Sequence, residues 1–140
     1  WNYWNAHEEE ESYGPVLQDS VRPIVDLGLA DFVSDDYRLS AEVSLIPTPG
    51  HTPGHVSVLI QSEGDRALIT GDCIHHPVQM TKTEWCSSAD YDQAQGQETR
   101  ENLLQTYVDT DVLIIGTHFA TPTAGHIKTL KTGGYWLDVS

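Results

Sequence analysis

The spacing of apolar residues changes near residue 31. Before that point, the aromatic residues of 1–11 and the aliphatic residues of 15–27 recur at helical intervals, which predicts two helices. We expect Pro23 to kink or interrupt the second helix and Gly28 to end it. The glutamates of 8–11 are expected to form a solvated face of the first helix. After residue 31 the apolar runs are short and separated by Ser and Asp, which predicts strands.

Strands are predicted at 32–33, 37–39, 43–46, 56–60, 67–70, 112–116 and 124–127. Gly64, between two of them, is expected at the positive-φ position of a hairpin turn. A helix is predicted over about 90–108, with Ser87 or Ser88 as its cap and Arg100 on its exposed face. This mixed order of strands and helices predicts an α/β (α+β) fold, with one mixed β-sheet and flanking helices.

Composition limits the possible partners and compartment. A chain of 140 residues can form one compact domain but not two of ordinary size. The 21 acidic and 7 basic residues give a net charge of −14, which repels nucleic-acid phosphates and anionic lipid. We therefore expect no nucleic-acid partner and no membrane partner. Cys73 and Cys86 do not form a Cys-x-x-Cys motif, and two free structural thiols favour a cytoplasmic protein.

Candidate chemistry is concentrated in the stretch Thr48-Pro-Gly-His-Thr-Pro-Gly-His55. Its prolines and glycines predict a loop with few free torsions, which would hold the imidazole of His51 as a metal ligand or catalytic base requires. A tight turn with solvated histidines is the alternative. Two later apolar runs end in Asp72 and His118, and ligand sites gather where buried strands end. A buried carboxylate needs a partner charge, so these three positions favour a metal site.

These motifs resemble the third, fourth and fifth metal-binding motifs of the metallo-β-lactamase fold superfamily. The segments Gly116-Thr-His-Phe119 and Ala124-Gly-His-Ile127 look most like the branch that holds N-acyl-homoserine lactonases and organophosphate hydrolases. The resemblance extends from about residue 32 to residue 130. The first motif of the family, His-x-His-x-Asp-His, does not occur among the seven histidines. We therefore expect residues 1–140 to be a single partial domain, the C-terminal half of an αββα sandwich in a larger, truncated enzyme.

The resemblance implies a hydrolase with two divalent metal ions, expected to be zinc. His51 would complete the coordination of the first ion, and His118 would complete that of the second. Asp72 would bridge both ions as the catalytic carboxylate. A metal-bound hydroxide would then attack a lactone, ester or phosphoester. Because these three ligands are divided between two ions, we expect residues 1–140 alone to bind metal weakly or at partial occupancy and to be inactive.

Other histidines follow from the same resemblance. His75 and His76 stand just after Asp72, where family members shape the mouth of the site, and His126 has a substrate-binding or supporting position. Exposed or structural histidines are the alternatives. We expect a small-molecule substrate, and a homodimer in which a second copy covers the sheet face that the missing half leaves open. The competing functions are a glyoxalase II-type thioesterase and a non-catalytic degenerate domain for oligomerisation or partner binding.

Overall fold

The computed structural model describes residues 1–7 and 14–140, which form two compact units, Trp1–Ser34 and Asp35–Ser140. The expectation of a single domain over 1–140 stays a prediction. The solvated face predicted at 8–11 lies outside the described residues. None of the helices in the described part of the chain is long and apolar enough to cross a bilayer.

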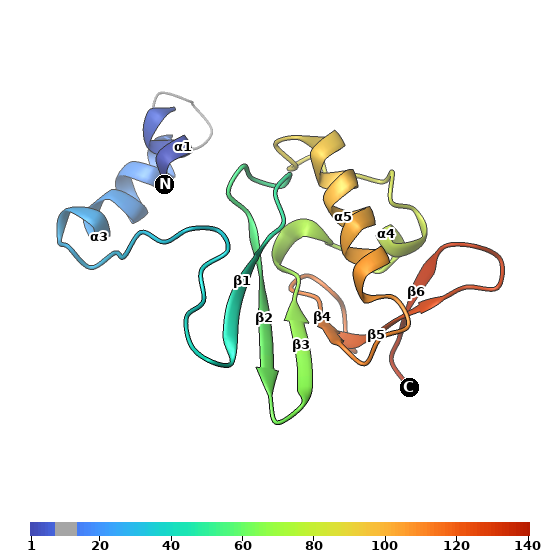
Figure 1. Ribbon diagram of the computed structural model, residues 1–140. Helices are drawn as coiled ribbons and strands as arrows, with labels where there is room; N and C mark the ends of the chain where they lie inside the picture. Colours follow the sequence, from blue (N-terminus) through green and yellow to red (C-terminus); the bar gives the residue numbers. More distant parts are fainter. Residues whose placement is uncertain (8–13) are drawn as a thin grey trace. The chain divides into compact units, whose positions relative to one another are not determined.

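The first unit is helical, and its second helix is interrupted as predicted. Pro23 lies in the first turn of the last helical segment, where the missing N–H removes no helical hydrogen bond. A π-helical turn comes directly before that segment. Gly28 follows it with a φ of 68°, which suits a residue that ends a helix. The elements are α1 (Asn2–Ala6), α2 (Gly14–Val16), the π-helical turn η1 (Leu17–Val21) and α3 (Arg22–Asp26), as labelled in Figure 1.

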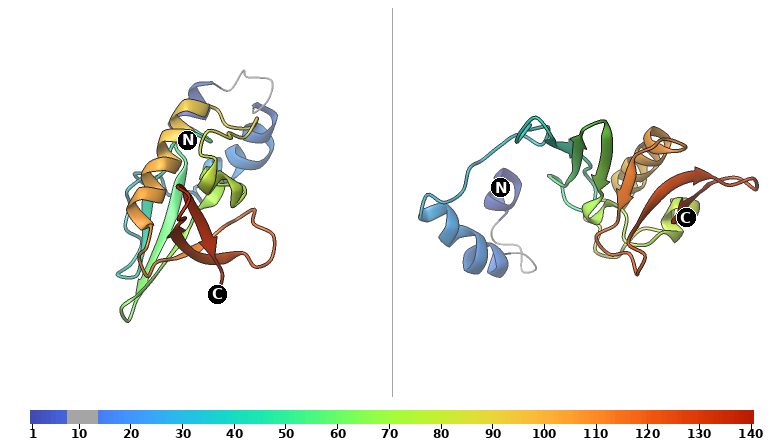
Figure 2. Two further views of the ribbon diagram at one scale, coloured as in Figure 1. Left: turned by 90° about the vertical axis from the view of Figure 1, so that its right-hand side faces the viewer. Right: turned by 90° about the horizontal axis from the view of Figure 1, so that it is seen from below.

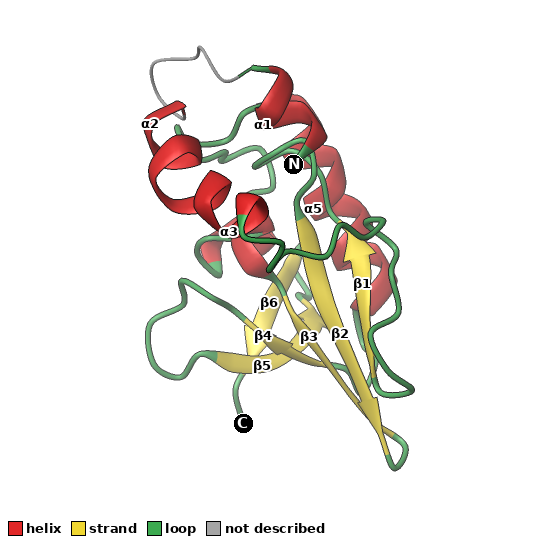
Figure 3. Cartoon of the chain, turned by 90° about the vertical axis from the view of Figure 1, so that its left-hand side faces the viewer, coloured by secondary structure: helices red, strands yellow, loops and turns green. Residues whose placement is uncertain are grey.

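The second unit is built on a mixed six-stranded sheet, which confirms the predicted fold class. The strands follow one another across the sheet in sequence order, and every neighbouring pair is antiparallel except β3 and β4, which are parallel. The last two strands turn strongly away from the first three, as Figures 1, 2 and 3 show from different sides. The strands are β1 (Val43–Pro47), β2 (Val56–Ser62), β3 (Asp65–Ile69), β4 (Leu113–Ile115), β5 (Ala124–Thr129) and β6 (Tyr135–Asp138).

The β2–β3 hairpin has the two-residue turn that the sequence predicts. Glu63 and Gly64 have φ values of 52° and 97°, and a two-residue turn with positive φ at both positions matches the twist of the flanking strands. The register pairs Ser62 with Asp65 at the turn and Val58 with Ile69 toward the other end. The segments that enter β2 and leave β3 therefore meet at one edge of the sheet.

The connection from β3 to β4 contains the turn η2 (Gly71–Cys73) and the helices α4 (Val78–Thr81) and α5 (Gln93–Tyr107). Leu103 and Leu104 of α5 join Leu68 of β3 and Ile114 of β4 in the hydrophobic core. Because β3 and β4 are parallel, their C-terminal ends lie at the same rim of the sheet.

Two details of α5 differ from the prediction. The cap is Asp92, whose side chain accepts a 3.0 Å hydrogen bond from the N–H of Gln95. Ser87 is instead used within the preceding loop, where its hydroxyl accepts from the N–H of Ala89. Arg100 is buried rather than exposed, because backbone carbonyls of the neighbouring loops accept its N–H groups.

The first two predicted strands are also wrong. Residues 32–33 lie outside any helix or strand, and of 37–39 only Arg38 forms a bridge, with Ser44. Both segments are exposed, so neither has the buried face that would favour pairing into the sheet.

Candidate metal centre

Three segments of the second unit meet at the rim where β3 and β4 end. They are the loop 48–55 before β2, the turn η2 after β3 and the loop after β4. The Asp72 carboxylate lies between two imidazoles: its Oδ2 is 3.3 Å from Nε2 of His51, and its Oδ1 is 2.9 Å from Nε2 of His118. The structure thus brings together the three side chains that the sequence singles out, with one imidazole on each carboxylate oxygen.

A buried carboxylate orients His51. The side chain of Asp90 is 1% exposed, and its Oδ1 lies 3.0 Å from Nδ1 of His51. The other oxygen of Asp90 accepts a 3.0 Å hydrogen bond from the N–H of Ser87. A carboxylate can only accept, so Nδ1 of His51 donates to Asp90, and Nε2 is the ring nitrogen directed at Asp72. This carboxylate–imidazole pair is the usual support of a metal-binding histidine.

The backbone around His51 is held by the segment that leads into α5. The N–H of Tyr91 donates to the carbonyl of His51 at 3.1 Å, and the N–H of Asp92 donates to the carbonyl of Gly50 at 2.9 Å. Gly50 has a φ of 134°, and a Cβ at this position would lie 2.3 Å from Cα of Gly96. The glycine at position 50 therefore lets the His51 loop and the first turn of α5 touch, which fixes the loop in place.

Asp72 is held by a histidine that faces it from the same loop as His51. Nε2 of His55 accepts a 2.9 Å hydrogen bond from the N–H of Asp72, and Nδ1 lies 3.0 Å from the carbonyl of Thr48. These two bonds require a neutral ring with its hydrogen on Nδ1. Burial lowers the pKa of His55 from its ordinary value, which favours that neutral form.

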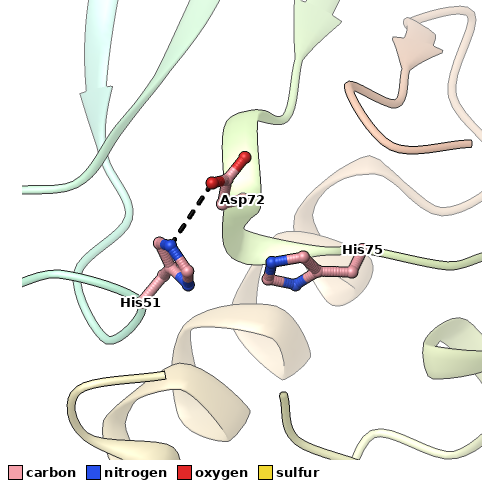
Figure 4. A group of neighbouring side chains, drawn as sticks. All are labelled: His51, Asp72 and His75. Atoms are coloured by element: carbon pink, nitrogen blue, oxygen red, sulfur yellow. Dashed lines mark ion pairs between the residues drawn. The ribbon is translucent and has the colours of Figure 1, made fainter. Parts of the chain in front are cut away.

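His75 belongs to the same cluster. Figure 4 shows its ring turned toward Asp72 and His51, and one ligand atom from each of these three side chains lies within 4.8 Å of the other two. The ring also stacks on that of His118, with centroids 5.0 Å apart. Its Nδ1 is buried and has no hydrogen-bond partner among the described residues. Burial lowers the pKa of His75, so the ring favours the neutral form that can bind a metal.

The other two predicted histidines lie in different surroundings. His76 is exposed, and its Nδ1 accepts a 3.0 Å hydrogen bond from the N–H of Val78 at the start of α4. His126 lies in β5 opposite Asp138 and lines a cavity with Arg66 and Leu113. Their predicted contact with a substrate stays a prediction.

Cys73 is a structural thiol. It is buried in the core, and its Sγ donates to the carbonyl of Thr70 at 3.1 Å. Burial raises the pKa of the thiol to about 11, so in the metal-free protein it stays protonated at neutral pH.

The donor set of the cluster suits a divalent metal ion. Imidazole nitrogens and a carboxylate oxygen are the ligands of catalytic zinc, and the buried Nδ1 of His75 has no partner in the part of the protein that the structure describes. Sequence reasoning missed Asp90 and the role of His55. Asp90 gave no local signal, whereas the repeat of Pro-Gly-His in the loop is a signal that could have pointed to His55.

The sequence matches a known protein family, and the fold is similar to that of several solved structures. The family model described as the metallo-beta-lactamase superfamily matches residues 2–118. The fold is similar to AidC, described as a dizinc quorum-quenching lactonase, at 24% identity and a TM-score of 0.80, over 94% of this chain and 46% of that one. It is also similar to the hydrolase AbOPH of the beta lactamase superfamily, at 23% identity and a TM-score of 0.77, over 89% and 43%.

A probable metal-dependent hydrolase from Staphylococcus aureus shares the fold at 16% identity and a TM-score of 0.62, over 93% of this chain and 50% of that one. The chain thus spans half or less of the length of these solved structures. No curated protein matches the sequence.

Proposed function

Because the chain belongs to the metallo-beta-lactamase superfamily, we propose that the protein is a metal-dependent hydrolase of a small-molecule lactone, ester or phosphoester. The observation that carries this proposal is the Asp72 carboxylate, which directs one oxygen to His51 and the other to His118. A carboxylate placed in this way suits a bridge between two ions, one held by each imidazole. The description of AidC as a dizinc lactonase supports zinc as the metal and a lactone as the first substrate to try.

The residues of this chain have distinct roles in the proposal. When bound, the divalent ions supply Lewis acidity, which lowers the pKa of a water molecule and polarises the group under attack. His51 and His118 would each provide a ring nitrogen as a ligand, and Asp72 would be the shared catalytic carboxylate. Asp90 holds the tautomer of His51, and His55 holds the backbone of Asp72. The stacked ring of His75 stands beside His118, where it can contact a substrate.

We propose that the 140 residues alone have little or no hydrolase activity. Catalytic zinc sites use three protein ligands and a water, and His51, Asp72 and His118 divided between two ions leave each ion with two. The chain spans 46% of AidC, which is consistent with further ligands outside these residues in the whole protein.

A second copy of the chain is the proposed partner. Large apolar side chains are exposed to solvent in both units, among them Leu27, Leu29 and Phe32 of the first and Trp136 of β6 in the second. Such exposure favours association. Light scattering at micromolar concentration should give twice the mass of the chain, and a monodisperse monomer would contradict this proposal.

The experiment that tests the function is an assay of the zinc-loaded protein encoded by the complete gene. The substrates are an N-acyl-homoserine lactone, a phosphotriester and a glutathione thioester, and Asp72→Asn is the matched variant. Turnover of the lactone or phosphotriester that Asp72→Asn abolishes supports the proposal. Turnover of the thioester alone would favour the glyoxalase II-type enzyme, and no turnover of any substrate would favour a non-catalytic domain.

A further inference from the structure

The candidate centre contains a third imidazole, that of His75. It is not a ligand when His51, Asp72 and His118 are divided between two ions. His75 follows Asp72 by one short turn, and its ring is directed at Asp72 and His51 (Figure 4). Ligand atoms of a tetrahedral zinc site lie about 3.4 Å apart, given bonds of about 2.0–2.2 Å. Asp72 and His51 already have this separation, at 3.3 Å, and His75 is within 4.8 Å of both. An approach of its ligand atom by up to about 1.4 Å would bring His75 into the same shell.

The backbone of His75 is fixed for such a role. The N–H groups of His75 and His76 donate to Oε1 of Gln79, at 2.7 and 3.2 Å. Gln79 is itself buried, and its Nε2 donates to the carbonyl of Trp85. The ring is thus presented by a clamped backbone, while its buried Nδ1 has no partner among the described residues. An unsatisfied buried nitrogen is unfavourable, and a bound metal ion would give this nitrogen a partner.

His118 is not part of the group of three side chains whose ligand atoms lie within 4.8 Å of one another. Its Nε2 faces Oδ1 of Asp72, whereas His51 faces Oδ2. The side chain of His118 is 49% exposed, and that of His51 is 17% exposed. His51 therefore stands on the more enclosed side of the carboxylate and His118 on the more open side, and the ring centroid of His75 lies 5.1 Å from that of His51 and 5.0 Å from that of His118.

We propose that His51, Asp72 and His75 form a three-ligand site that holds one zinc ion within this chain alone. The inference rests on the proposed function, because it concerns the same centre, but it assigns the ligands differently. Two imidazoles, one carboxylate and an open fourth position are the ligand set of a catalytic zinc. Asp90 accepts from the ring of His51, and Gln79 holds the backbone of His75. We therefore expect the chain to bind one zinc ion with three ligands. Its affinity should be higher than that of a site with only two protein ligands.

The test is a zinc titration of the metal-free 140-residue protein against a chromophoric chelator, with Co²⁺ absorption as a second readout. We expect one ion for each chain. His75→Ala should lower zinc affinity by about tenfold or more, since even loss of a supporting residue costs about 10–100-fold. His76→Ala is the matched control, because His76 is adjacent and exposed, and it should leave the affinity unchanged. His118→Ala should change the affinity far less than His75→Ala.

His75→Asp provides the check on folding, because aspartate is also a zinc ligand and should restore part of the affinity and the Co²⁺ spectrum that His75→Ala loses. Wild-type affinity in His75→Ala would overturn the inference whatever His118→Ala does, and so would a wild-type chain that binds no zinc. Either result is read from metal binding alone. It is therefore distinct from failure of the proposed function, which is read from hydrolysis by the protein of the complete gene.

Discussion

The backbone N–H of Asp72 donates a 2.9 Å hydrogen bond to Nε2 of His55, a side chain that comes from the same loop as His51. Through its Nδ1, His55 also holds the carbonyl of Thr48 at the start of that loop. One neutral ring therefore joins the two segments that carry His51 and Asp72. The distance between these two side chains depends on a residue that is not itself a proposed ligand.

His55→Ala should lower the free energy of unfolding by about 1–3 kcal/mol, because it leaves the buried N–H of Asp72 without an acceptor. His55→Gln can place an amide oxygen near the position of Nε2, so its loss should be smaller. Urea denaturation of the metal-free proteins measures both. Equal losses in the two variants would show that the Asp72 bond contributes little.

Asp90→Ala should weaken zinc binding by about 10–100-fold, because the His51 ring loses the carboxylate that fixes its tautomer. Asp92→Ala is the matched control two residues away. It removes the cap of α5 and should cost about 1 kcal/mol of stability with little effect on zinc affinity. Zinc titration and ¹⁵N NMR of the His51 ring test the pair, and an unchanged tautomer in Asp90→Ala would contradict the assigned role.

Arg100→Met should destabilise the protein by at least about 3 kcal/mol. The guanidinium is 1% exposed and donates to the carbonyls of Cys73 and Thr83, which would be left unsatisfied in the variant. Arg66→Met, at an exposed position, should change stability by less than about 0.5 kcal/mol. Thermal or urea unfolding compares the two, and similar small effects would mean that water replaces the guanidinium.

Cys73 should make stability fall at high pH. Burial raises its folded-state pKa from 9.0 to about 11, so the folded protein keeps the proton that the unfolded chain loses. The stabilisation is fully present below pH 9 and is lost as the pH rises through 11, up to about 2–3 kcal/mol. The difference in unfolding free energy between the metal-free wild type and Cys73→Ala, measured from pH 8 to 11, isolates this effect. A pH-independent difference would contradict it.

Those parts of the fold and site that depend on local pattern could be predicted from the sequence. Gly64 marked its hairpin turn, and the β2–β3 hairpin then fixed which loop ends meet. Asp72 and His118 stood out because each follows an apolar run, and polar residues at strand ends share a rim when the strands are parallel.

The remaining features depend on segments that are distant in sequence. Asp90 lies 39 residues from His51, and no local sequence pattern near either residue predicts the hydrogen bond between them. Arg100 has the spacing of an exposed helix position, but carbonyls from the loop before α5 accept its donors and bury it. Residues 32–33 have strand-like composition without a neighbouring strand to pair with. Tertiary contacts decided each case, and local propensity could not anticipate them.

The parallel pairing of β3 with β4 sets the order in which the centre can assemble. His51 and Asp72 flank a tight hairpin, and hairpins close within microseconds. Asp72 and His118 are 46 residues apart, and their strands share only three register pairs. Such a pairing must first overcome the chain entropy of a long closed loop, which makes it a slow step. The approach of His51 to Asp72 therefore needs only local pairing, whereas the arrival of the His118 imidazole depends on the long-range pairing of β3 with β4.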